Sequence, residues 1–170
     1  MSIKFATRKK LRSKDVMWLF SVAAELAVEL LGLEEAVASK QIKFSLVNNQ
    51  RSGVYGSCEA QWSSDMAADL GLEPDKVRVR VNEKMQLEAS IKTIGHELVH
   101  AKQYVKRELT EDRVFNGKPY RFVEYADAPW EHEAHAFEDP FYELFQERVA
   151  EKLGCEREAK KFIKYFSTRW

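Results

Sequence analysis

The decapeptide GHELVHAKQY, residues 95–104, holds two histidines four positions apart, His96 and His100, with Glu97 directly after the first. At about 3.6 residues per turn, this spacing places both imidazoles on one side of an α-helix, where they can bind one metal ion. Glu97 lies about a quarter of a turn away, so it can reach a water molecule that the ion activates without being a ligand itself. The stretch therefore predicts a helix that carries most of a metal site.

The residues around this motif have the periodicity of one long helix, from about residue 85 to residue 107. One apolar stripe is formed by Leu87, Ile91, Ile94, Leu98, Ala101 and Val105. The two histidines project opposite this stripe, together with Thr93, Glu97, Gln103 and Tyr104. We expect the helix to bury one face and to keep a polar, metal-binding face on the other.

A third ligand has to come from elsewhere, because catalytic zinc usually takes three protein ligands and leaves one position open for water. The remaining histidines, His132 and His135, both lie in the stretch PWEHEAHAFE, residues 129–138, where the proline can open a second helix. Burial alone does not decide between Glu131 and Glu133. We favour Glu131, because His135 lies one turn later and could support it by a hydrogen bond. Glu133, His135 and His132 remain open as alternatives.

The rest of the chain predicts a small α+β domain. Its elements follow in the order helix, three strands, helix, hairpin and C-terminal helices, over residues 15–31, 42–46, 54–62, 77–81, 85–107, 114–122, 129–154 and 157–166. Asn116-Gly117 supplies the hairpin turn, and Pro140 could kink or divide the helix in which it lies. Residues 63–75 read as a loop with room for one helical turn. We expect a single domain over residues 1–170, with its core at about 40–145.

The composition is that of a globular protein, with 45% apolar and 32% charged residues and a formal net charge of zero. This balance gives no strong field for nucleic acid, so the basic run over residues 8–14 is expected to be solvated. Glu25 and Glu29 interrupt the apolar stretch that follows, which argues against a secretory signal and a membrane span. Cys58 and Cys155 are expected to be free thiols, and the cytoplasm is the expected location.

Together, HELVH at residues 96–100 and PWEHEA at residues 129–134 resemble the motifs of zincin metallopeptidases, most closely small gluzincin-type enzymes such as those encoded by bacteriophages. In those families a glutamate at the start of the later helix completes the zinc site, and Glu131 fits this position. The resemblance covers about residues 40–145. It implies a minimal zincin-like fold, in which a helix packs on a small sheet and the strand KVRVRVN, residues 76–82, forms the rim of the cleft.

The chain also departs from these families. Larger gluzincins place an acidic residue four positions after the ligand glutamate, and His135 stands there in this sequence. SprT-like proteases share the HExxH motif but complete the site with a third histidine, a part that His135 or His132 could play. A DNA-associated protease of the SprT-like type therefore remains an alternative.

The resemblance implies hydrolysis of peptide bonds with zinc as cofactor and Glu97 as general base. Tyr104 and Tyr125 are the expected donors to the oxyanion, with Tyr120 as a further candidate. Arg78 and Arg80 would lie on an edge strand that pairs with an extended peptide. We expect a peptide or protein substrate and no nucleic acid or membrane partner.

The competing hypothesis is a non-catalytic binding or assembly module, in which the metal only staples the fold. Such a structural site is normally closed by four protein ligands, which His135 would make possible. A glutamate between the two histidine ligands has no use in a structural site, so Glu97 favours the enzyme.

Overall fold

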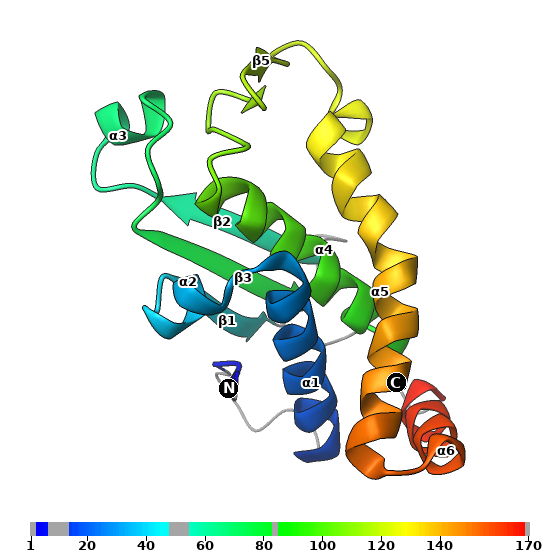
Figure 1. Cartoon of the computed structure of the whole chain (residues 1–170). Coiled ribbons are helices and arrows are strands. Elements are labelled where there is room, and N and C mark those ends of the chain that lie inside the picture. Colours follow the sequence, from blue (N-terminus) through cyan, green and yellow to red (C-terminus); the bar gives the residue numbers. More distant parts are fainter. Residues whose placement is uncertain (1–2, 7–13, 48–54, 83–84, 169–170) are drawn as a thin grey trace.

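The computed structural model describes residues 3–6, 14–47, 55–82 and 85–168 (Figure 1). Within these residues, the helices are α1 (Lys14–Leu31), α2 (Glu34–Ala38), α3 (Asp65–Asp69), α4 (Leu87–Val105), α5 (Pro129–Leu153) and α6 (Glu156–Ser167), with a 3₁₀ turn η1 (Tyr125–Asp127). The strands are β1 (Ile42–Val47), β2 (Gly56–Gln61), β3 (Lys76–Asn82), β4 (Val114–Phe115) and β5 (Lys118–Pro119). The predicted α+β class and the predicted order of elements are confirmed. The short helix α2 was not predicted.

The three longer strands form a mixed sheet in the order β1-β3-β2, with β1 parallel and β2 antiparallel to β3. The prediction that KVRVRVN is an edge strand is therefore wrong, because β3 lies in the centre. Arg78 stands between Lys43 and Glu59 on the neighbouring strands, and Arg80 forms an ion pair with Glu59. In a sheet that is covered on one face only, central and edge strands show the same alternation, so the pattern could not separate the two cases.

The two outer strands of this sheet differ in what covers them. The N-terminal segment, residues 3–6, runs along β1: the Ala6 amide donates to the Phe44 carbonyl at 3.0 Å, and the Leu46 amide donates to the Ala6 carbonyl at 3.0 Å. In the part of the chain that the structure describes, β2 pairs only with β3. The outer edge of β2 is thus the open edge of the described sheet.

Helices α1 and α4 cover one face of the sheet, and α5 lies along α4 (Figure 1). The inward residues of β3, Val77, Val79 and Val81, are completely buried in the core against these helices. Contrary to the expectation of an open polar face, α4 is covered on that side too. Its buried polar residues are Ser90, Glu97, His100 and Gln103. The HELVH motif of α4, residues 96–100, therefore faces α5.

The start and the end of α5 are fixed by local chemistry. Pro129 occupies the first turn, and Gly154 ends the helix in the left-handed conformation at φ 67°. Pro140 lies within α5 and does not divide it. Because proline has no N–H group, the Ala136 carbonyl receives no helical hydrogen bond, and since Ala136 is exposed, water can donate to it instead. Trp130 is buried beside Leu109 and anchors the start of this helix.

The hairpin before α5 has the turn that the sequence predicts. Asn116 and Gly117 have φ angles of 48° and 77°, the left-handed pair that a two-residue hairpin turn requires. Phe115 on this hairpin packs its ring against Trp130, with centroids 6.2 Å apart. The hairpin thus supports the first turn of α5.

Two further sequence predictions concern the whole chain. Cys58 and Cys155 are free thiols. No helix within the described ranges is long and apolar enough to cross a membrane.

The ring of Phe141 on α5 packs directly against α4 at Gly95, the residue before His96. A Cβ atom at this position would lie 2.5 Å from Cδ1 of Phe141 on α5, well inside van der Waals contact. Glycine is therefore needed at position 95 because any side chain there would collide with the Phe141 ring. The distance between the two helices depends on this contact.

We predict that Gly95→Ala forces α5 away from α4 and lowers the free energy of unfolding by about 1–3 kcal/mol, measured by urea denaturation. A second comparison uses Phe141→Leu as the background, because this change removes the ring that the new methyl group would meet. In that background Gly95→Ala should cost less. Equal stability of Gly95→Ala and wild type would contradict the close approach.

Candidate metal centre

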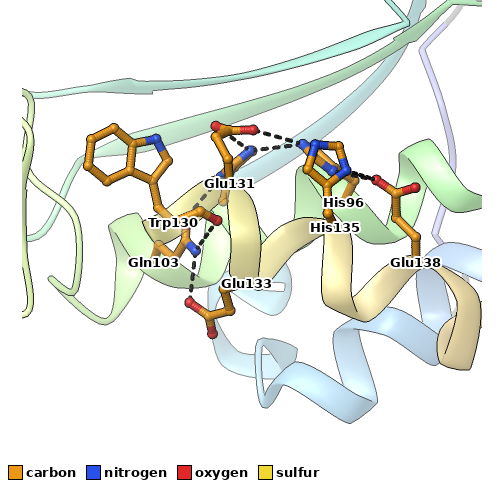
Figure 2. Close-up of polar contacts among 8 residues, drawn as sticks. His96, Gln103, Trp130, Glu131, Glu133, His135 and Glu138 are labelled. Carbon is orange, nitrogen blue, oxygen red and sulfur yellow. Dashed lines mark hydrogen bonds and ion pairs between the residues drawn. The ribbon is translucent and has the colours of Figure 1, made fainter. Parts of the chain in front are cut away.

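Three side chains from α4 and α5 meet at one point. His96 and His100 lie on successive turns of α4, and Glu131 lies in the first turn of α5 (Figure 2). The two Nε2 atoms are 3.1 Å apart, and the Glu131 oxygens lie 3.4 Å from Nε2 of His96 and 3.3 Å from Nε2 of His100. These three residues form a group that could hold a metal ion.

The outer nitrogen of each histidine fixes which ring atom carries the proton. Nδ1 of His96 lies 2.8 Å from Oε1 of Glu138, and Nδ1 of His100 lies 2.9 Å from Oε1 of Gln103. Both oxygens can only accept, so each Nδ1 donates and each neutral ring has its lone pair on Nε2. The lone pairs of both rings therefore point at each other and at the Glu131 carboxylate.

The charges and the burial around these three side chains suit a cation. Glu131 is 2% exposed, and its Oε1 accepts no hydrogen bond from the described residues. Burial works to raise the pKa of Glu131, but contacts with His100, His96 and Tyr125 bring it well below its usual range. Burial works to lower the pKa of His96, and Glu131 and Glu138 raise it overall. The site thus favours a cation between the three donors.

The three ligand atoms lie close enough together for one metal ion to contact all of them. An ion with bonds of about 2.0–2.1 Å to each ligand sets neighbouring ligand atoms about 3.3–3.4 Å apart. The three measured separations of 3.1, 3.3 and 3.4 Å are close to this value. A proton can be shared along only one of these three lines, whereas an ion satisfies all of them.

Of the other candidates for the third ligand, Glu133 and His132 lie apart from this group, whereas His135 forms a second group with His96 and Glu138 that could also hold an ion. Oε1 and Oε2 of Glu133 contact Lys102 and Gln103 at 2.6 and 2.9 Å, and His132 is exposed. His135 does not support Glu131 as we expected. Its Nδ1 lies 2.7 Å from Oε1 of Glu138, because its ring points along α5 toward the next turn.

Glu138 is a site residue that the sequence reasoning did not identify. One of its oxygens, Oε1, accepts from Nδ1 of both His96 and His135 (Figure 2). A carboxylate on the far nitrogen of a histidine ligand fixes the ring and makes it a better donor to metal. The available signal was spacing: Glu138 lies seven residues after Glu131, two helical turns along the same face.

Glu97 lies beside these donors, under the open strand β2. Its side chain is 6% exposed, and a Cβ atom at Gly56 would lie 2.6 Å from its Oε1. Burial raises the pKa of Glu97 to about 7, although His100 and His96 act to lower it. Among the described residues, no hydrogen bond occupies this carboxylate, so it can accept a proton from a molecule in the site.

The three tyrosines differ in their relation to the site. Tyr125 is 60% exposed, and burial of its hydroxyl together with a hydrogen bond to Glu131 raises its pKa. Tyr104 packs its ring against Trp62 with centroids 6.0 Å apart, and burial raises its pKa to about 12. Tyr120 packs against Trp130 with centroids 6.1 Å apart. Tyr125 is the one that contacts a member of the metal-binding group.

Comparisons with known proteins add no relative: no protein-family model matches the chain, and neither the curated proteins nor the solved structures searched contain a match. The functional interpretation therefore depends on the geometry of the site itself.

We predict that the protein binds one divalent ion per chain and that Glu131→Gln abolishes this binding, because the amide presents no anionic oxygen. A hundredfold excess of ion over its dissociation constant should stabilise the wild type by about 2.7 kcal/mol, a rise in Tm of several degrees. Titration calorimetry and thermal unfolding in chelator measure both effects. His132→Gln is the control, since His132 is exposed, and it should bind like wild type.

Proposed function

We propose that the chain is a zinc-dependent metallopeptidase of the gluzincin type, with His96, His100 and Glu131 as ligands and Glu97 as general base. The proposal depends mainly on one observation: a buried glutamate stands beside three converging donors from two helices. Two imidazoles and one carboxylate suit zinc, and three protein ligands leave a coordination position for water. A minimal zincin-like fold is part of the proposal.

When bound, zinc makes water a stronger acid and polarises the scissile carbonyl. Glu97 takes one proton from the attacking water, whose oxygen bonds to the carbonyl carbon. As the carbon–nitrogen bond breaks, Glu97 delivers this proton to the leaving nitrogen, and the second proton of the water stays on the new carboxyl group. The products are a carboxylic acid and an amine, between which that proton then passes to give a carboxylate and an ammonium ion. Glu97 suits both steps because no other described residue occupies its carboxylate.

The open edge of β2 gives an extended peptide a place to bind. Backbone groups of β2 can pair with a peptide by strand addition, the role that we expected of β3. Gly56 on this strand lies directly over Glu97. A peptide along β2 would therefore run past the general base. Tyr125 is the better placed donor to the oxyanion, because it already contacts Glu131 and is partly exposed.

The same observations weigh against the two alternatives. A structural staple would need a fourth ligand, and within the described residues the group around Glu131 has three members. His135, the candidate for closing it, is bound to Glu138. A SprT-like site needs a third histidine, and a glutamate occupies that place.

We predict that Glu97→Gln keeps the metal and lowers the rate of peptide hydrolysis by about 10²–10⁴-fold, because the amide cannot take up the proton. A peptide library incubated with zinc-loaded wild type and variant, with products identified by mass spectrometry, measures this. Wild type that binds zinc and leaves the whole library intact would contradict the proposed peptidase. Equal cleavage by Glu97→Gln would remove Glu97 from its role.

A second prediction tests how Glu97 is held. In Gly56→Ala the new methyl group would displace the Glu97 carboxylate. We expect kcat to fall on the order of 10²-fold, because the carboxylate no longer lies at the right distance and angle to take the proton from water. Zinc affinity should stay at the wild-type level, since Glu97 is not a ligand. In a Glu97→Gln background the Gly56→Ala change should have no further effect on the remaining rate. Additive losses would point to a general disturbance of β2.

A further inference from the structure

Gln103 links the metal ligand His100 to the helix that carries Glu131. This residue is 0% exposed and lies one turn after His100 on α4. Its Oε1 faces Nδ1 of His100 at 2.9 Å, and its Nε2 donates to the Trp130 carbonyl at 3.1 Å and to Oε2 of Glu133 at 2.9 Å (Figure 2). Every polar atom of the amide therefore has a partner.

The two acceptors decide which way the Gln103 amide faces. A carbonyl and a carboxylate can only accept, so the amide NH₂ must face Trp130 and Glu133, and the amide oxygen must face His100. In the reversed amide, the NH₂ would face Nδ1 of His100, which would then have to carry a lone pair. The proton of the neutral ring would move to Nε2, and the lone pair facing Glu131 would be lost.

We propose that Glu133 is a positioning residue for the metal ion, acting through Gln103. Together with the Trp130 carbonyl, its carboxylate holds the amide in the orientation that keeps the His100 proton on Nδ1 and leaves Nε2 free to bind the ion. This inference rests on the metal site of the proposed function and extends it. In the sequence analysis Glu133 was an alternative third ligand. In the structure it instead contacts Gln103, which orients the ligand His100.

Lys102 supplies a matched control for this role. Its Nζ lies 2.6 Å from Oε1 of Glu133 and 2.8 Å from Oε2 of Glu108, whereas Gln103 contacts the other oxygen of Glu133. Glu133→Ala and Lys102→Met therefore break the same ion pair. Only Glu133→Ala also removes one of the two acceptors that orient the amide, which leaves the Trp130 carbonyl as the other.

The test compares zinc affinity, by competition with a chelator, and the protonation of the His100 nitrogens, by ¹⁵N NMR of the metal-free protein. Glu133→Ala should bind zinc about 10–100-fold more weakly than wild type and show His100 with protons on either nitrogen. Lys102→Met should stay close to wild type in both measurements. Equal affinities and equal His100 spectra in the two variants would overturn the proposal.

A double variant tests whether Glu133 acts through the amide. Gln103→Leu removes the amide, so Glu133→Ala should not weaken zinc binding further in that background, and additive losses would contradict the proposal. If Gln103→Leu does not fold, the comparison of Glu133→Ala with Lys102→Met still decides. None of these measurements needs peptide hydrolysis. A protein that binds zinc in this manner and cleaves nothing would refute the peptidase while leaving the role of Glu133 intact.

Discussion

The convergence of three lone pairs at the α4–α5 contact is the constraint on which the described site depends. Two neutral imidazoles and a carboxylate within 3.1–3.4 Å of one another repel unless a positive charge lies between them. Burial strengthens this repulsion, because the surroundings screen it less than water would. Any ion held by these three donors would depend on the docking of α5 on α4, since neither helix alone presents all three.

The docking needs both small residues and large anchors. Gly95 lets Phe141 lie against the backbone of α4, which brings the first turn of α5 within reach of the histidines. Trp130, buried with Leu109, holds that turn from the other side of Glu131. A carboxylate placed between two packed contacts keeps its direction without a hydrogen bond to its Oε1. Apolar packing thus fixes the direction of the Glu131 carboxylate, which elsewhere would require hydrogen bonds to both of its oxygens.

The sequence predicted what depends on local periodicity. Helix α4, the start of α5 at Pro129, the Asn116-Gly117 turn and the grouping of His96 with His100 all follow from spacing along one segment. What it could not predict depends on contacts between segments. The central place of β3 is one such case, because Val77, Val79 and Val81 would alternate equally well in an edge strand. The partners of Glu133 and Glu138 on α4 are another, since which turn of α4 each faces is set by how the helices cross.

Glu131 and Glu133 illustrate why two similar residues, two positions apart on one helix, receive different tasks. They project about 200° apart around α5, so only one can face the histidine nitrogens. The other faces Lys102 and Gln103, where a negative charge is neutralised and an amide is oriented. Along this path from Lys102 to His100, both oxygens of Glu133 and both polar atoms of the Gln103 amide have a partner in reach, whereas Oε1 of Glu131 accepts no hydrogen bond from the described residues. The network therefore leaves the Glu131 carboxylate facing the two histidine nitrogens, where one ion could contact all three residues.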